Sequence, residues 1–214
     1  MPHAIRIHQT GGPEVLRWEE VDVPAPAAGE ATVRHHAVGL NFIDTYHRTG
    51  LYPLPLPAGI GLEGAGVVEA VGAGVSEVKV GDRVAYAGGP VGAYAEVRNL
   101  PAHRLLKLPD AIGFDTAAAM MLQGLTAAYL LRRTYRVQPG DAVLIHAAAG
   151  GVGLIACQWA KALGATVIGT VGSEEKAAIA RAHGCDHPIV YTRENFTQRV
   201  REITGGEGVP VVYD

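Results

Sequence analysis

Short apolar segments alternate with turn residues along the first half of the chain. Residues 4–9, 16–23, 30–39, 66–72, 82–87, 92–98 and 103–109 each have strand-like composition, and Gly, Pro and Asp separate them. Strands this short and closely spaced are typical of a small antiparallel barrel or sandwich. Residues 42–50 predict a short helix that ends at Gly50, whereas the Pro and Gly of residues 49–61 predict a loop without regular structure.

The pattern changes after residue 114. Residues 115–133 consist mainly of helix formers, with Gly124 as the single interruption. Apolar strand patterns at 141–148, 165–171, 187–192 and 208–214 then alternate with helical patterns at 151–164, 173–184 and 193–205. Continuous Val/Ile runs between helices predict βαβ units around a buried parallel sheet. The sequence therefore predicts an α/β protein with a β-rich domain at 1–122 and a Rossmann-type domain at 123–214.

The second domain has few strands for its class. A doubly wound dinucleotide-binding sheet usually has about six strands, and only four are predicted here. We therefore expect the chain to be a fragment of a longer polypeptide, with its Rossmann sheet truncated at Asp214.

A group of small residues separates the first of these strands from its helix. Residues 148–153 match A-x-G-x-x-G, a variant of the dinucleotide-binding fingerprint in the required strand–turn–helix setting. Glycines allow a pyrophosphate to approach the backbone, and the helix N-terminus offers unpaired N–H groups and partial positive charge. The following helix carries one apolar stripe, in which Trp159 is interpreted as a core residue. A tight glycine turn without a ligand is the alternative.

The end of the second strand indicates which nucleotide binds. NAD sites place an acidic residue there, about 20 residues past the glycines, to bind the ribose hydroxyls. This chain has Val171, Gly172 and Ser173 at that point, followed by Lys176 in the next helix. Ser173 is predicted to cap that helix. A small polar group with a cation suits a 2′-phosphate, so NADPH is the predicted cofactor.

Composition bears on the possible partners and on the cellular location of the protein. The 214 residues are 48% hydrophobic and 18% charged, with a formal net charge of −3 and no basic block, which argues against a nucleic-acid partner. No signal-peptide pattern and no apolar run of ~20 residues is present, so we expect no membrane segment and a cytoplasmic location. Cys157 and Cys185 form no CxxC motif, which is consistent with reduced thiols.

Several ordered motifs resemble the quinone oxidoreductases, the zinc-free, zeta-crystallin-like branch of the medium-chain dehydrogenase/reductase superfamily. They are NFIDTYHRTGLYP (41–53), GDRVAYA (81–87), GLTAAYLL (124–131), HAAAGGVGLIACQWAKALGA (146–165) and ITGGEGVPVVYD (203–214). The resemblance implies a GroES-like, partly open β-barrel followed by a Rossmann domain. It also implies a homodimer, formed through parts of the family's chains that lie beyond Asp214.

The resemblance also assigns residues to a site. It implies that Gly150, Gly151 and Val152 meet the pyrophosphate, and that Gly172, Ser173, Lys176 and Tyr191 surround the adenosine 2′-phosphate. Thr126 is implied near the nicotinamide. Asn41, Tyr46 and Tyr52 are implied to line the substrate side.

A metal is not expected. Asn41 stands where the related zinc alcohol dehydrogenases carry a Cys, and Gly61-Leu62-Glu63 stands where they carry Gly-His-Glu. His35 and His36 are adjacent on a predicted strand and should therefore point to opposite faces, so they cannot converge on one ion.

A site without a metal suits an acceptor that is already electrophilic, such as a quinone. Asn41 and Tyr46 could donate hydrogen bonds to developing oxyanion charge, each worth ~3 kcal/mol, and Tyr52 could act as a gate. The resulting hypothesis is an NADPH:quinone oxidoreductase acting on a small-molecule quinone. Two alternatives stay open: reduction of activated C=C bonds in enals or enones, and a non-catalytic nucleotide-binding protein of the crystallin or RNA-binding kind.

Overall fold

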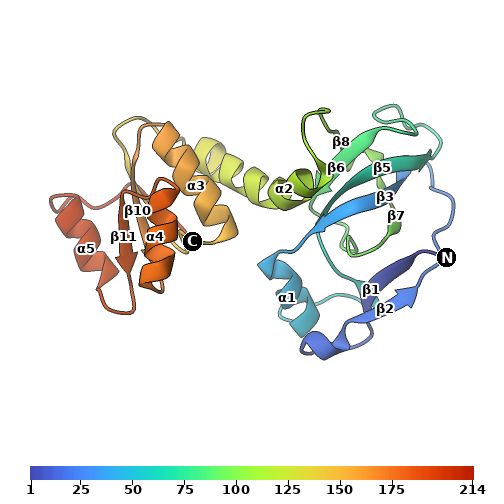
Figure 1. Ribbon diagram of the computed structural model, residues 1–214, viewed down its shortest axis with the longest axis horizontal. Coiled ribbons are helices and arrows are strands. Elements are labelled where there is room, and N and C mark those ends of the chain that lie inside the picture. The colour runs from blue at the N-terminus through green and yellow to red at the C-terminus, as the bar shows by residue number, and fades with distance from the viewer. The chain divides into compact units, whose positions relative to one another are not determined.

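The computed structural model describes residues 1–214, which fold into two compact units, Met1–Leu122 and Gln123–Asp214 (Figure 1). Each unit has its own hydrophobic core and is described separately below. None of the helices is both long and apolar enough to cross a membrane.

Two antiparallel sheets build the first unit. The smaller has the order β2-β1-β4 and the larger the order β7-β3-β5-β6-β8. The strands are β1 (His3–Ile7), β2 (Arg17–Glu20), β3 (Glu30–Gly39), β4 (Ala58–Gly59), β5 (Glu63–Val71), β6 (Arg83–Ala87), β7 (Val97–Pro101) and β8 (Leu106–Lys107). This partly closed arrangement of short strands confirms the predicted GroES-like architecture.

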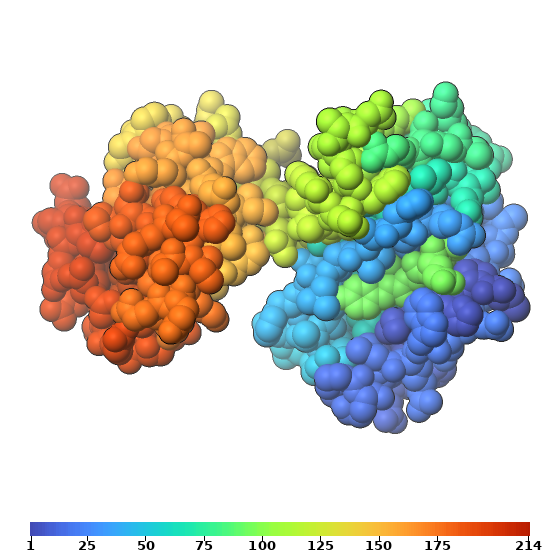
Figure 2. Space-filling model, viewed as in Figure 1, coloured from blue at the N-terminus to red at the C-terminus, as the bar shows by residue number.

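Residues 94–96 connect the two sheets. The N–H of Ile5 donates to the carbonyl oxygen of Tyr94 at 2.7 Å, and the N–H of His35 donates to that of Glu96 at 2.9 Å. Figure 2 shows this light-green segment at the surface between the blue segments of β1 and β3. Val33, Val68 and Leu100 belong to a core cluster of the same unit that is almost completely closed to solvent. The backbone thus joins the sheets on one side while apolar side chains fill the interior.

The short predicted helix forms as expected. Helix α1 (Phe42–Thr49) ends at Gly50, whose φ of +84° is a left-handed conformation that glycine adopts readily. The loop after it was predicted to contain no regular structure, and this is wrong for Ala58 and Gly59. These two residues form β4 and pair with Ile7 and Arg6 of β1. They follow the last proline of the loop, so their N–H groups are available for pairing.

The strand boundaries near residue 100 also differ from prediction. The expected strand at 92–98 is shifted, since β7 begins at Val97 and extends to Pro101. Leu100 is 1% exposed, and its burial explains why the strand continues past residue 98. A 3-10 turn at Ala102–Arg104 then replaces the start of the expected strand at 103–109, which leaves only β8.

The second unit is a parallel sheet of order β11-β10-β9-β12 between helices. Its strands are β9 (Ala142–Ile145), β10 (Thr166–Val171), β11 (His187–Val190) and β12 (Val211–Tyr213), and its helices are α3 (Gly151–Ala162), α4 (Glu174–Ala182) and α5 (Phe196–Ile203). Helix α2 (Phe114–Tyr129) passes through Gly124 without a break and ends in a π turn at Leu130–Thr134. The predicted α/β class and parallel Rossmann-type sheet are confirmed.

Apolar side chains cover both faces of this sheet. Val143, Val167 and Trp159 belong to one cluster, and Leu144, Ile168 and Val200 belong to another. Because neighbouring residues of a strand point to opposite faces, Val143 and Leu144 enter different clusters. The two-sided burial explains why the strands read as continuous apolar runs, and it supports the interpretation of Trp159 as a core residue.

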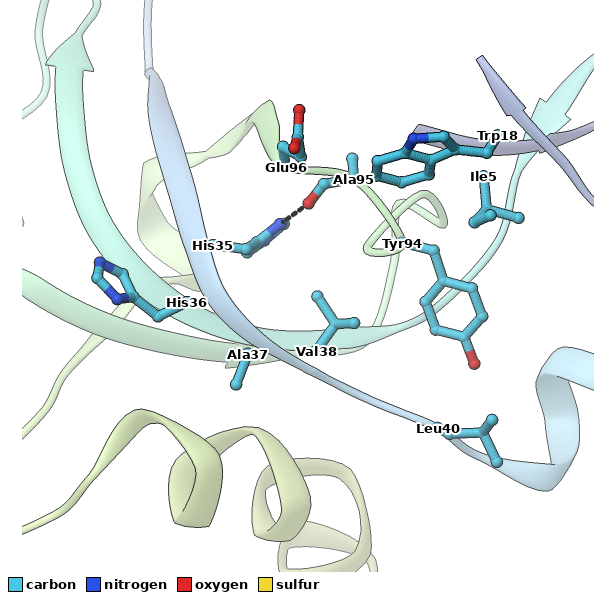
Figure 3. Close-up of a pocket in the computed structure, with 10 residues that line it drawn as sticks. All are labelled: Ile5, Trp18, His35, His36, Ala37, Val38, Leu40, Tyr94, Ala95 and Glu96. Atoms are coloured by element: carbon cyan, nitrogen blue, oxygen red, sulfur yellow. Dashed lines mark hydrogen bonds between the residues drawn. The ribbon is translucent and has the colours of Figure 1, made fainter. Parts of the chain in front are cut away.

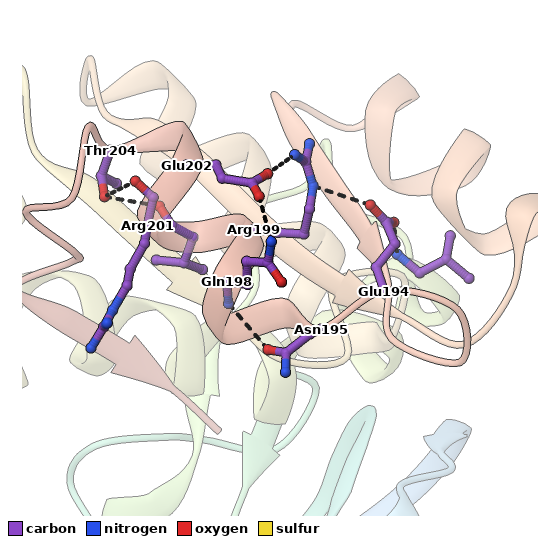
Figure 4. A network of polar contacts seen from close by, with 9 residues as sticks. Glu194, Asn195, Gln198, Arg199, Arg201, Glu202 and Thr204 are labelled. Carbon is purple, nitrogen blue, oxygen red and sulfur yellow. Dashed lines mark hydrogen bonds and ion pairs between the residues drawn. The ribbon is translucent and has the colours of Figure 1, made fainter.

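Polar contacts define the limits of helix α5. Oδ1 of Asn195 accepts a hydrogen bond from the N–H of Gln198 at 3.1 Å and caps the helix (Figure 4). The guanidinium of Arg199 contacts the carboxylates of Glu194, at 3.1 Å, and Glu202 (Figure 4). These contacts mark where the helix begins and ends. Because the groups are exposed, the contacts contribute little to the free energy of unfolding.

We predict that Ile168→Ala lowers the free energy of unfolding by about 3 kcal/mol, because a fully buried side chain is lost between β10 and the helices. Urea unfolding followed by circular dichroism measures the effect. The matched control is Val80→Ala, where the side chain is 59% exposed, and the expected change is within about 0.5 kcal/mol. Equal losses in the two variants would contradict the assigned core.

Candidate active site

The turn between β9 and α3 is tightly wound. Ala147 has a φ of +48°, and the N–H of Gly150 donates to the carbonyl oxygen of Ala147 at 2.7 Å. The N–H of Ala148 donates to the carbonyl oxygen of Thr170 at 3.0 Å, which anchors the turn to β10. Helix α3 begins at Gly151, with Gly150 as its N-cap. The first N–H groups of α3 have no acceptor within the helix, so this end can bind an anion.

The three glycines of the turn have different roles. A Cβ on Gly153 would lie 2.3 Å from the carbonyl oxygen of Ala147 and 2.8 Å from the Cα of Ala148. A Cβ on Gly151 would lie 2.4 Å from the side chain of Gln123. At Gly150 the nearest atom would be 3.1 Å away. Gly153 and Gly151 therefore permit close packing within the protein, and Gly150 has the loosest surroundings of the three, although a Cβ there would still make a tight contact with the carbonyl oxygen of Ala147.

A cavity of about 650 Å³ lies at the carboxyl end of the parallel sheet. Gly150, Gly172, Lys176 and Tyr191 are among its lining residues, and all four were predicted to bind the cofactor. The other lining residues are His146, Ala147, Ala149, Thr170, Val171, Phe196 and Asp214. Ligands of open α/β sheets bind at this edge, so the cavity has the expected position for a nucleotide.

The remaining predicted cofactor residues lie outside this lining. Gly151 and Val152 form the first turn of α3, where their backbone rather than their side chains would meet a ligand. Thr126 lies on α2. Ser173 is the N-cap of α4, and its Oγ accepts from the N–H of Lys176 at 3.3 Å, as the sequence predicted.

The cavity is lined by one cationic side chain, Lys176, and one acidic residue, Asp214. Lys176 forms no ion pair, so its ammonium group keeps its charge available. Of the two acids at the start of α4, Glu174 pairs its carboxylate with the guanidinium of Arg193, whereas hydrogen bonds from Ser173 and the backbone lower the pKa of Glu175 and favour its charged form. No carboxylate follows β10 at Gly172, where an NAD site has its acidic residue.

Sequence reasoning missed His146 and Phe196. Nδ1 of His146 lies 2.8 Å from Oγ1 of Thr170, and its ring meets that of Phe196 edge-on with centroids 5.3 Å apart. His146 directly follows β9, and residues that follow strands of a parallel sheet gather at its binding edge. The position of His146 after a strand could therefore have predicted its place in the cavity. No sequence pattern predicted that of Phe196, because the loop before α5 brings this residue to the cavity.

In the first unit, the predicted substrate residues surround helix α1. Asn41 is its N-cap and is buried, and its N–H donates to Oδ2 of Asp44 at 2.9 Å. The rings of Tyr46 and Tyr52 meet edge-on with centroids 5.3 Å apart, and Phe42 and His47 extend this aromatic row. Tyr52 is half exposed. The fold therefore brings Tyr46 and Tyr52 together.

Glu63 was not among the predicted site residues, yet it contacts one of them, Asn41. It is 1% exposed, and its Oε1 accepts from Nδ2 of Asn41 at 2.6 Å while its Oε2 accepts from the N–H of Leu122 at 2.7 Å. Burial is the main cause that raises the pKa of this carboxyl group. Its place in Gly61-Leu62-Glu63, where the zinc alcohol dehydrogenases carry Gly-His-Glu, was the available signal, but nothing in the sequence pairs it with Asn41 or Leu122.

A second, apolar cavity of about 490 Å³ lies beside β3, and Ile5, Trp18 and Val38 are among its lining side chains (Figure 3). His35 and His36 point to opposite sides of the strand (Figure 3). Nδ1 of His35 lies 2.6 Å from the carbonyl oxygen of Ala95, and burial lowers the pKa of this imidazole to about 4. No group of three or more His, Cys, Asp or Glu side chains converges anywhere in the chain.

Comparison with known proteins agrees with both units. Residues 27–110 match the alcohol dehydrogenase GroES-like domain family, and residues 151–214 match the zinc-binding dehydrogenase family. The quinone oxidoreductase of Pseudomonas aeruginosa is 57% identical over 100% of this chain and 66% of its own length. The 2-haloacrylate reductase of a Burkholderia species is 52% identical over 100% of this chain and 66% of its own length.

A solved structure extends the comparison to three dimensions. The Escherichia coli quinone oxidoreductase complexed with NADPH is 54% identical, with a TM-score of 0.97 over 99% of this chain and 65% of that chain. The chain spans about 66% of the length of the curated relatives that it matches. It therefore belongs to the quinone oxidoreductases of the medium-chain dehydrogenase/reductase superfamily.

Proposed function

We propose that the protein reduces quinones with NADPH. The observation that carries this proposal is the cation of Lys176 in a cavity beside a dinucleotide-type turn, with no carboxylate at Gly172 to bind a bare ribose. NADPH differs from NADH by a 2′-phosphate, which a free ammonium group attracts and a carboxylate repels. The related Escherichia coli enzyme, whose structure contains NADPH, supports this choice of cofactor.

The residues around the cavity fit such a nucleotide. Gly150, with the N–H groups of Gly151 and Val152 at the start of α3, would hold the pyrophosphate. Gly172, Ser173, Lys176 and Tyr191 would surround the 2′-phosphate. Thr126 is assigned to the nicotinamide end. Bound in this way, NADPH supplies the reducing equivalents, and the protein holds and orients it.

On the substrate side, Tyr46 is the stronger candidate for stabilising developing negative charge. Its hydroxyl forms no hydrogen bond within the protein, whereas one N–H of the Asn41 amide already donates to Glu63. Tyr52 contacts the ring of Tyr46 and is exposed enough to move, so it is assigned the role of a gate. A quinone oxygen accepts hydrogen bonds as charge builds on it, and donors placed there lower the barrier.

A second candidate function is the reduction of activated C=C bonds, which the similarity to the 2-haloacrylate reductase supports. The expected outcome of a direct assay is that purified protein oxidises NADPH faster with 1,2-naphthoquinone than with a 2-alkenal at equal concentration. Absorbance at the NADPH band measures both rates. A faster reaction with the alkenal would favour the second function, and NADPH binding without oxidation would favour a non-catalytic role.

The family resemblance also supports a homodimer, and the two cysteines without a CxxC motif support a cytoplasmic location. Light scattering of the purified full-length protein tests the dimer directly.

We predict that Lys176→Ala weakens NADPH binding by ten-fold or more, because one charge-assisted contact to the phosphate is lost. Binding of NADH should change less than two-fold, since that nucleotide has no 2′-phosphate. Fluorescence titration measures both dissociation constants. Lys79→Ala removes an exposed lysine of the first unit and should leave the dissociation constants of both nucleotides unchanged. Equal weakening of the two nucleotides by Lys176→Ala would contradict the assignment.

We predict that Tyr46→Phe lowers kcat for 1,2-naphthoquinone by roughly ten-fold, because a donor to the developing oxyanion is lost. Tyr52→Phe should mainly raise KM. The dissociation constant of NADPH should stay the same in both variants. Steady-state kinetics with fluorescence titration separates these effects, and Tyr129→Phe is the control for loss of an exposed tyrosine hydroxyl. Unchanged turnover in both variants would remove the two tyrosines from the site.

A further inference from the structure

A buried carboxylate lies directly behind Asn41. Glu63 begins β5, the central strand of the larger sheet, and pairs with Gly39 of β3 and Ala87 of β6. Its side chain is almost completely closed to solvent. Acidic side chains are rarely buried to this extent unless they are paired with a cation, and Glu63 takes part in no ion pair. Its burial therefore requires another explanation.

Two N–H donors hold this carboxylate. Nδ2 of Asn41 and the backbone N–H of Leu122 donate to different oxygens, at 2.6 Å and 2.7 Å. Burial, together with the nearby charge of Asp44, raises the pKa of Glu63, and both donors oppose this by favouring the charged form. Each oxygen of the carboxylate thus accepts a hydrogen bond from a different N–H donor.

The space around the carboxylate leaves it little freedom to move. A Cβ on Gly39 would lie 2.3 Å from Oε1 of Glu63 and 2.2 Å from the carbonyl oxygen of Ala118. Asn41 is fixed from its backbone as well, because its N–H donates to Oδ2 of Asp44, which also accepts from the hydroxyl of Tyr94 at 2.7 Å. Donor and acceptor are therefore both held in place.

We propose that Glu63 is a positioning residue that sets the orientation of the Asn41 side-chain amide. A carboxylate only accepts hydrogen bonds, so it holds Nδ2 of Asn41 toward itself and turns Oδ1 away. The reversed amide would place two acceptor oxygens 2.6 Å apart, which is strongly unfavourable. Glu63 thereby decides which polarity Asn41 presents. The inference rests on the proposed function, because Asn41 must meet the substrate for this polarity to affect turnover.

A merely structural role has a different signature. If Glu63 served only to satisfy the N–H of Leu122, glutamine would replace it well, because Oε1 of glutamine accepts the same hydrogen bond. The amide nitrogen of that glutamine would then face Nδ2 of Asn41, donor against donor. Asn41 would have to rotate its amide by half a turn, which reverses its polarity and exchanges the groups that face Glu63 and, in the capping box of α1, the backbone of Asp44.

The test is Glu63→Gln in the purified protein. We expect kcat for 1,2-naphthoquinone to fall by roughly ten-fold, while the NADPH dissociation constant and the urea midpoint stay close to those of the unchanged protein. The two Nδ2 proton resonances of Asn41 should shift in the NMR spectrum. Glu69→Gln is the matched control, since Glu69 lies on the same strand, is exposed and pairs with Arg34. It should change neither kinetics nor the Asn41 resonances.

Three results would overturn the proposal. The first is a variant in which neither kcat nor the Asn41 resonances change, and the second is a fall in kcat that comes with an equal loss of NADPH binding and a lowered urea midpoint. The third is a lack of protection of the Asn41 side-chain amide protons from hydrogen exchange in the unchanged protein. The exchange measurement decides the hydrogen bond even if Glu63→Gln does not fold. A chain that reduces no quinone refutes the proposed function, and the resonance shift then still decides whether Glu63 orients Asn41.

Discussion

The close approach of helix α3 to strand β9 is the constraint on which the second unit depends. Gly153 sits so near the carbonyl oxygen of Ala147 that no side chain fits between them, and the turn is tied to β10 through the carbonyl oxygen of Thr170. This contact aims the N-terminus of α3 at the edge of the sheet. The cavity, its partial positive charge and the position of Lys176 relative to the turn all follow from that geometry.

The glycine motif was recognisable in the sequence, but the different contacts that its glycines make were not. The spacing of Gly150, Gly151 and Gly153 reads as a set of equal contacts with a ligand. In the structure, Gly151 accommodates the side chain of Gln123, which belongs to an earlier helix, and Gly153 accommodates backbone. A sequence pattern indicates that small residues are required at these positions. Which neighbour creates that need depends on tertiary packing, which no local pattern contains.

The same limit applies to the first unit. Alternating apolar residues predicted most strands, because burial of one face imposes a period of two. Ala58 and Gly59 escaped detection, since two residues carry no periodicity and only pairing with β1 makes them a strand. Glu63 escaped for a related reason. Its partners, Asn41 and Leu122, lie 22 and 59 positions away in the chain, so its role depends on contacts that only folding creates.

The position of Gly172 has a consequence for redesign of coenzyme preference. A common route from a phosphorylated to an unphosphorylated nucleotide introduces an acid at the tip of the second strand. Here any side chain at residue 172 would begin 3.1 Å from the hydroxyl of Tyr191, tighter than most contacts of a Cβ allow. An acid introduced there would therefore push the hydroxyl of Tyr191 back by a few tenths of an ångström, so a change of coenzyme preference at residue 172 also moves a second side chain of the pocket.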